Sequence, residues 1–259
     1  PHEHVGLAAA AGETRVSGHP GAMVAHVDVG LLNMGAAIHN AFRGRYPVLM
    51  MSGYAPSALP GSRRGARDSY IQWFQQLRDQ GEIVRQYTKW DHRLTTFDAP
   101  DLIIARAIQV MLTPPRGPAY LAIPREVAMA AAPATAREIP LATRAPGGPD
   151  AGQLREIAEA LLQSEAPLIS TDWLDALGVP WLTELAELIG APVITGDTML
   201  ALPADHPLAR ADVRAFPLPP ETDFVLAVET IVPWLPDGRE GGRRPRVAFI
   251  GLDPIASAT

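Results

Sequence analysis

The feature that most constrains the fold of this chain is a series of short, continuous apolar segments that alternate with stretches of helical periodicity. In the first half the apolar segments are GAMVAHV (21–27), YPVLMMSG (46–53) and GPAYLAIP (117–124). Continuous apolar strands joined by helices are typical of a parallel sheet that is covered on both faces. We expect intervening helices over 30–43, 69–80 and 99–113, and extended chain over 82–90.

Residues 131–150 interrupt this alternation with four prolines and two adjacent glycines, a composition typical of an interdomain linker. The alternation then restarts, and its last apolar segment is RVAFIGLDP (246–254). The sequence therefore predicts two doubly wound α/β domains, residues 1–134 and 151–259, joined by a linker over 135–150. Because the chain opens without Met and ends on a strand rather than on a packed helix, we expect a fragment that is truncated at both ends.

Composition narrows the classes of function. The net charge of −6 argues against nucleic acid as a partner. The absence of cysteine excludes disulfides, thiolate metal sites and a cysteine nucleophile. The sequence has no apolar run near the ~18 residues that a membrane span requires, and its N-terminus lacks the basic-then-apolar order of a signal peptide. We therefore expect a cytoplasmic protein that binds neither nucleic acid nor membrane.

The first residues, PHEHVGLAAAAGE (1–13), place an acid between two histidines at the start of an alanine-rich helix. One interpretation is an exposed metal-binding tip made of His2, Glu3 and His4. The other is that Glu3 is a functional carboxylate. Side chains at i and i+2 on a helix point apart, and the sequence supplies no further ligand at zinc spacing. It therefore predicts no metal site in this chain.

A second candidate site is the segment HVDVGLLNMG (26–35). We expect a strand to end near His26, the backbone to turn at Gly30, and a helix to begin around residues 31–33. Ligands of open α/β sheets gather at such junctions, where glycine permits a close approach of the backbone and Asn33 can donate or accept a hydrogen bond. Because these junctions are common, the segment alone leaves a purely structural interpretation open.

Several segments, taken in order, carry a resemblance to a known family. They are Glu3 before a small-residue helix with Gly12, SGHPG (17–21), the strand to His26, Gly30 with Asn33, YPVLMMSG (46–53), RGPAYLAIPREV (116–127) and, in the second half, LLQSEAPLIS, ELAELIGAPVIT, PADHPL and FIGLDP. This ordered set resembles the pyrimidine-binding and central domains of thiamine diphosphate enzymes of the acetolactate synthase and benzoylformate decarboxylase family. The resemblance covers essentially the whole chain.

The resemblance implies a lyase or transferase that forms or cleaves the C–C bond next to the carbonyl of a small 2-keto acid, with thiamine diphosphate and Mg²⁺ as cofactors. It implies that Glu3 hydrogen-bonds the N1′ atom of the cofactor's aminopyrimidine ring and so promotes loss of the C2 proton, while Gly30 and Asn33 shape the cofactor pocket. His26 corresponds to a position where some decarboxylases carry an active-site histidine; a histidine bonded to backbone at a strand end is the alternative. The family builds each site between two subunits, which implies a homo-oligomer.

In this family a separate domain holds the diphosphate and the metal through a Gly-Asp-Gly signature that is missing from this sequence, so we expect the chain by itself to be inactive. Related central domains sometimes bind FAD, but STDWLDALG (170–178) lacks a G-x-G-x-x-G pattern, which favours a structural role over a flavin site. Asp28, close to the expected cofactor position, departs from the family pattern. This departure and the truncation motivate an alternative, a non-catalytic homologue that serves as a binding or assembly module.

The last candidate is the loop PGSRRGARD (60–68), which in relatives borders the active site at a dimer interface. Arg63, Arg64 and Arg67 have the chemistry to bind a carboxylate or a phosphate bidentately. Most charged loops, however, are only solvated. The sequence does not single out any one of the three arginines.

Overall fold

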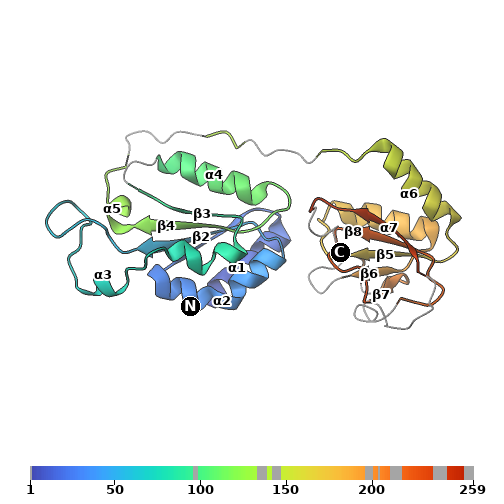
Figure 1. The fold of residues 1–259 in the computed structure, drawn as a ribbon, viewed down its shortest axis with the longest axis horizontal. Coiled ribbons are helices and arrows are strands. Elements are labelled where there is room, and N and C mark those ends of the chain that lie inside the picture. Colours follow the sequence, from blue (N-terminus) through green and yellow to red (C-terminus); the bar gives the residue numbers. More distant parts are fainter. Residues whose placement is uncertain are drawn as a thin grey trace. The chain divides into compact units, whose positions relative to one another are not determined.

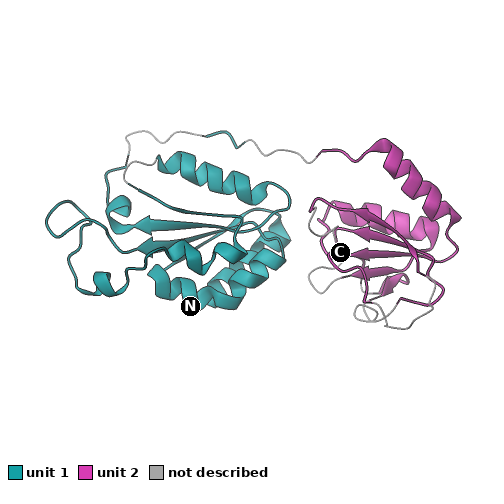
Figure 2. Ribbon diagram, in the orientation of Figure 1, with its two compact units in different colours: residues 1–145 teal, residues 146–259 magenta. Residues whose placement is uncertain are grey.

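The structure, a computed structural model, describes residues 2–95, 99–132, 139–141, 147–195, 201–203, 205–210, 218–235 and 244–253. The chain divides into two compact units, residues 1–145 and 146–259 (Figure 2). Most of the expected linker over 135–150 lies outside the described residues.

Unit 1 is built on a four-stranded parallel sheet with the strand order β1–β2–β4–β3 (Figure 1). Its strands are β1 (Gly21–Ala25), β2 (Val48–Tyr54), β3 (Trp90–Arg93) and β4 (Ala119–Pro124). Its helices are α1 (Glu3–Ser17), α2 (Val27–Arg43), α3 (Ile71–Phe74), α4 (Pro100–Leu112) and α5 (Arg125–Ala128), with the 3-10 turns η1 (Gln80–Ile83) and η2 (Arg85–Tyr87).

The two inner strands, β2 and β4, are covered on both faces, which explains why they are largely apolar without alternation. In β4, Tyr120 packs in a core cluster with residues of α1 and α2, whereas its neighbour Leu121 packs on the opposite face with residues of α4. Successive side chains of a strand point to opposite faces, so nearly every position of these two strands is buried. Local signals bound the helices: Pro100 stands in the first turn of α4, and Gly18 ends α1 in a left-handed conformation with φ 74°.

Two expectations about residues 69–90 are wrong. Only Ile71–Phe74 is α-helical, and the stretch expected to be extended begins with η1 and η2 before β3 starts at Trp90. The reason is tertiary: the side chain of Gln80 turns into the core and donates from Nε2 to the hydroxyl of Tyr120 at 2.8 Å. Buried polar contacts of this kind outweigh the small differences in local propensity.

Unit 2 has a five-stranded parallel sheet with the order β7–β6–β5–β8–β9 (Figure 1). Its elements are α6 (Ala151–Gln163), β5 (Pro167–Thr171), α7 (Gly178–Ile189), β6 (Val193–Thr195), β7 (Ala209–Arg210), β8 (Phe224–Val228) and β9 (Arg246–Ile250). Residues of α6 and α7 pack on one face, and Leu218 and Trp234 pack on the other. The predicted fold class, two parallel-sheet α/β domains, is confirmed. Among the described residues we find no helix whose length and apolar character would let it cross a membrane.

Candidate functional site

Glu3 is the first residue of α1, and its carboxylate lies against the first turns of α2. Asn33 donates a hydrogen bond from Nδ2 to Glu3 Oε2 at 3.2 Å. Gly30 lies about one turn earlier on α2, and a Cβ added there would stand 3.1 Å from Glu3 Oε1. The bare backbone of Gly30 therefore leaves the space that the Glu3 carboxylate occupies. Of the four candidates Glu3, His26, Gly30 and Asn33, all but His26 meet at this point.

The surroundings of Glu3 favour its ionised form. The pKa of Glu3 is lowered, first by a hydrogen bond from its own main-chain N–H and second by the bond from Asn33. The side chain is partly exposed, so a ligand can reach it. One carboxylate oxygen is thus held by an amide, while the other lies beside a bare glycine. This arrangement can present an oriented acceptor to a ring nitrogen.

The two histidines that flank Glu3 mark the start of the helix. His2 is the N-cap of α1, and its Nδ1 accepts a hydrogen bond from the main-chain N–H of His4 at 3.3 Å. A side chain that accepts from the first free N–H groups of a helix stabilises its N-terminus. Across the ranges that the structure describes, no three His, Cys, Asp or Glu residues come together in a way that could hold a metal ion.

The prediction of a turn at Gly30 is wrong, because α2 begins three residues earlier, at Val27. The N–H of Gly30 donates to the carbonyl of His26 at 2.7 Å, as in a regular helix. The chain passes from β1 into α2 without a loop because Val27 adopts φ 35°, a positive value that strains a β-branched residue. His26 is exposed at the N-cap position, and its side chain makes no capping bond.

Asp28 stands in the first turn of α2, where the positive end of the helix dipole favours a carboxylate. Its Oδ1 is buried and, among the described residues, has no hydrogen-bond partner. Buried polar atoms are nearly always hydrogen-bonded in native proteins. Asp28 is therefore a second carboxyl group at this end of α2 with an unused acceptor.

The arginines of the loop after β2 have different surroundings. Arg67 is buried: its Nε donates to the carbonyl of Pro56 at 2.7 Å, and its guanidinium lies 4.6 Å from the centroid of the Trp73 ring. These contacts give Arg67 a structural role. Arg63 and Arg64 are exposed, and only Arg63 of the two lines a pocket.

Two further charged residues were missed in the sequence. Glu126 and Arg93 line the same pocket as Arg63, at the carboxyl ends of β3 and β4. Ligands of parallel α/β sheets bind outside the carboxyl ends of the strands. The signal that could have found both residues is therefore a charged side chain at, or directly after, the end of a strand.

This chain is similar in sequence to known proteins. Residues 1–83 match the family model of the thiamine pyrophosphate enzyme, N-terminal TPP binding domain. Benzoylformate decarboxylase of Pseudomonas aeruginosa is 27% identical over 74% of this chain and 35% of that protein. A protein of Oryza sativa subsp. japonica named "Probable acetolactate synthase 2, chloroplastic" is 26% identical over 80% of this chain and 31% of that protein.

Among solved structures, a thiamine diphosphate-dependent 4-hydroxybenzoylformate decarboxylase of Rhodococcus jostii matches with a TM-score of 0.76 and 22% identity, over 99% of this chain and 50% of that one. At this identity the structural likeness establishes the fold alone. The chain spans about a third of the length of the two curated relatives described above. The similarities confirm the resemblance that the ordered segments of the sequence carry.

Proposed function

We propose that the whole protein forms or cleaves the C–C bond next to the carbonyl of a small 2-keto acid, because residues 1–83 match the family model of the N-terminal TPP binding domain of thiamine pyrophosphate enzymes. The curated relatives are named as a benzoylformate decarboxylase and an acetolactate synthase, which both fit this reaction class. The observation that carries the proposal is the contact between Glu3 and Asn33 beside Gly30.

The residues at this contact fit the pyrimidine ring of thiamine diphosphate. Glu3 offers a carboxylate that can exchange a proton with a ring nitrogen, and Asn33 fixes its orientation through Oε2. A side chain at position 30 would crowd Glu3 Oε1, so Gly30 keeps this acceptor accessible. When bound, thiamine diphosphate supplies the electron sink for breaking or making a bond to a carbonyl carbon.

His26 is the candidate for proton transfer on the substrate side. It is exposed directly after β1, four residues before Gly30, and an imidazole ring can both donate and accept a proton. Asp28, with its unused Oδ1, is the residue that sets this chain apart from the family pattern. The alternative of a non-catalytic binding or assembly module rests on this departure.

The whole protein is further proposed to bind Mg²⁺ and the diphosphate through a domain beyond this chain, so that the chain alone is inactive. We propose a homo-oligomer in the cytoplasm. Exposed apolar side chains around α3 support a subunit contact: Ile71 is 44% exposed, Trp73 48% and Phe74 77%. Apolar side chains gathered at a surface often mark protein–protein interfaces.

The test is exchange of the C2 proton of thiamine diphosphate in the full-length protein, measured by quenched NMR. Glu3→Gln removes the ionisable carboxyl group but keeps an oxygen that can accept from Asn33, and should slow exchange by roughly 10²–10⁴-fold. Glu13→Gln, on an exposed position of the same helix, is the matched control and should leave the rate unchanged. Equal exchange in the two variants, with equal circular dichroism, would remove Glu3 from the mechanism.

Binding of the cofactor decides between the enzyme and the non-catalytic module. The full-length protein should bind thiamine diphosphate with Mg²⁺ saturably, as followed by tryptophan fluorescence. A folded full-length protein that binds none would favour the assembly module.

A further inference from the structure

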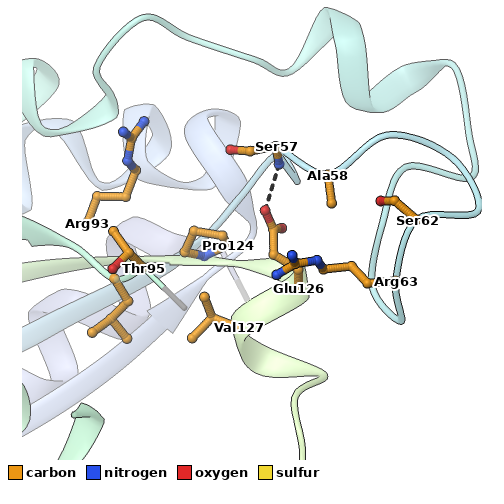
Figure 3. Close-up of a pocket in the computed structure, with 10 residues that line it drawn as sticks. Ser57, Ala58, Ser62, Arg63, Arg93, Thr95, Pro124, Glu126 and Val127 are labelled. Atoms are coloured by element: carbon orange, nitrogen blue, oxygen red, sulfur yellow. Dashed lines mark hydrogen bonds between the residues drawn. The ribbon is translucent and has the colours of Figure 1, made fainter. Parts of the chain in front are cut away.

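Unit 1 contains a pocket of about 330 Å³ at the carboxyl ends of three neighbouring strands (Figure 3). Its walls come from the loop after β2, from the end of β3 and the residues that follow it, and from the junction between β4 and α5. None of Glu3, His26, Gly30 and Asn33 lines it. The volume lies at the lower end of the range found for small-molecule sites.

Glu126 is the polar side chain that the pocket leaves unsatisfied. The residue is 7% exposed, and its Oε1 accepts a hydrogen bond from the main-chain N–H of Ser57 at 2.8 Å (Figure 3). Its Oε2 is buried and has no partner among the described residues. Leaving a buried acceptor unpaired is unfavourable, so this atom favours a ligand that brings a donor.

The loop that forms one wall is fixed against α5. Gly65 has φ 81°, and a Cβ there would stand 2.7 Å from the Cα of Glu126, so the two backbones touch. Three residues on, Asp68 accepts two hydrogen bonds from Arg125, at 2.6 and 2.8 Å. These contacts, with the bond from Ser57 to Glu126, hold both ends of the loop before any ligand arrives, which lowers the cost of ordering on binding.

Two arginines supply positive charge around the same pocket. Arg93 is held by Tyr54: its NH1 donates to the tyrosine hydroxyl at 3.2 Å, and its guanidinium lies 5.1 Å from the ring centroid. Arg63 is exposed and forms no ion pair with any residue that the structure describes. Guanidinium groups bind carboxylates through paired hydrogen bonds. The lining therefore offers donors for an anion and, in Glu126, a buried carboxylate with one unused oxygen.

We propose that this pocket is a binding site for a small carboxylate that also carries a hydrogen-bond donor, with an α-amino acid as the ligand class. The ligand's carboxylate binds Arg63 and Arg93, and its ammonium group donates to Glu126 Oε2. This inference goes beyond the proposed function, because the proposed role of Glu3 makes no use of this pocket.

The test is titration calorimetry at pH 7 on the full-length protein, with L-alanine as the probe. Propionate keeps the carboxylate without the donor, and ethylamine keeps the donor without the carboxylate. L-alanine should bind saturably, and each partial analogue should bind at least tenfold more weakly. Absence of saturable L-alanine binding, or equal binding of propionate, would overturn the proposal.

Three variants assign the contacts. Glu126→Gln keeps an oxygen for the N–H of Ser57 but can turn a donor toward the ligand; it should weaken L-alanine binding at least tenfold and leave propionate binding unchanged. Arg63→Met should weaken the binding of both, and because Arg63 is exposed the variant should fold. Arg64→Met, in the same loop but outside the lining, is the control and should bind as the unmodified chain does. Unchanged L-alanine binding in both Glu126→Gln and Arg63→Met would refute the site.

Discussion

Gly65 gives the sharpest test of how the loop after β2 is held. Its φ of 81° is a left-handed value, which costs an L-residue about 1–2 kcal/mol. A Cβ there would also stand 2.7 Å from the Cα of Glu126 and 2.9 Å from the carbonyl oxygen of Arg125, and both are backbone atoms that cannot rotate away. Overpacking of this kind costs about 1–3 kcal/mol. The smaller entropy of the unfolded alanine chain offsets about 0.4–1 kcal/mol.

Gly65→Ala should therefore lower the free energy of unfolding by about 2–4 kcal/mol. Gly61→Ala is the matched control in the same loop: Gly61 has φ 77°, but an added Cβ would meet no atom within 4 Å. It should cost about 1 kcal/mol or less, because the left-handed strain remains while the clash is absent. The difference between the two variants, about 2 kcal/mol, isolates the contact with α5.

Amide hydrogen exchange of residues 119–124, followed by mass spectrometry, is the suitable assay. It reports on unit 1 alone, whereas bulk unfolding of a chain with two units need not be two-state. A difference of 2 kcal/mol corresponds to roughly 30-fold in the open population and hence in the exchange rate. Equal exchange rates in Gly65→Ala and Gly61→Ala would refute the close packing of this loop on α5.

Three further outcomes follow from the contacts. Asn33→Ala should raise the pKa of Glu3, but the hydrogen bond from the main-chain N–H of Glu3 should still keep this pKa below its usual value. A ¹³C NMR titration of the Glu3 carboxyl group would measure the change. The pKa of Asp68 is lowered, first by its hydrogen bond from Arg125. Arg125→Met should therefore lower the free energy of unfolding above pH ~4, and this loss should vanish as the pH falls through the lowered pKa of Asp68. Urea unfolding at several pH values would measure it. Tyr120→Phe removes a buried hydroxyl that is hydrogen-bonded to two side chains, and should lower the free energy of unfolding by about 1–3 kcal/mol, as hydrogen exchange of β4 would measure. In the unmodified chain, absorbance at high pH should show that Tyr120 ionises above the usual tyrosine pKa, because burial disfavours the phenolate.

The sheets could be predicted from the sequence because their signal is local. A strand buried on both faces is apolar at nearly every position, and β2 and β4 show this in their own residues. The stretch over 69–90 could not be predicted in the same way. Its course depends on where Gln80 finds partners, and these lie 28 and 40 residues away, on Ser52 and Tyr120.

The same distinction between local and long-range signals applies to the candidate site. Glu3 and Asn33 are 30 residues apart and were linked only through the ordered resemblance, which the structure completes with a hydrogen bond. The pocket of Glu126 depends on three segments that the sheet brings to one edge, and no single segment carries a motif for it. A polar residue that directly follows a buried strand is the sequence signal that such pockets leave.

The sequence does not show which of Arg63, Arg64 and Arg67 faces the pocket, because the three are of the same residue type in one loop. The three differ in the structure because the backbone between them reverses at Gly65, whose φ of 81° is open to glycine at little cost. After this reversal Arg67 turns inward to the carbonyl of Pro56, while Arg63, before it, stays at the rim of the pocket. Counting positive charges on the loop would assign anion binding to all three arginines. The reversal at Gly65 separates Arg67 from the other two, and of the two arginines before it only Arg63 lines the pocket, so replacing Arg63 and Arg64 in turn is a fair test of the site.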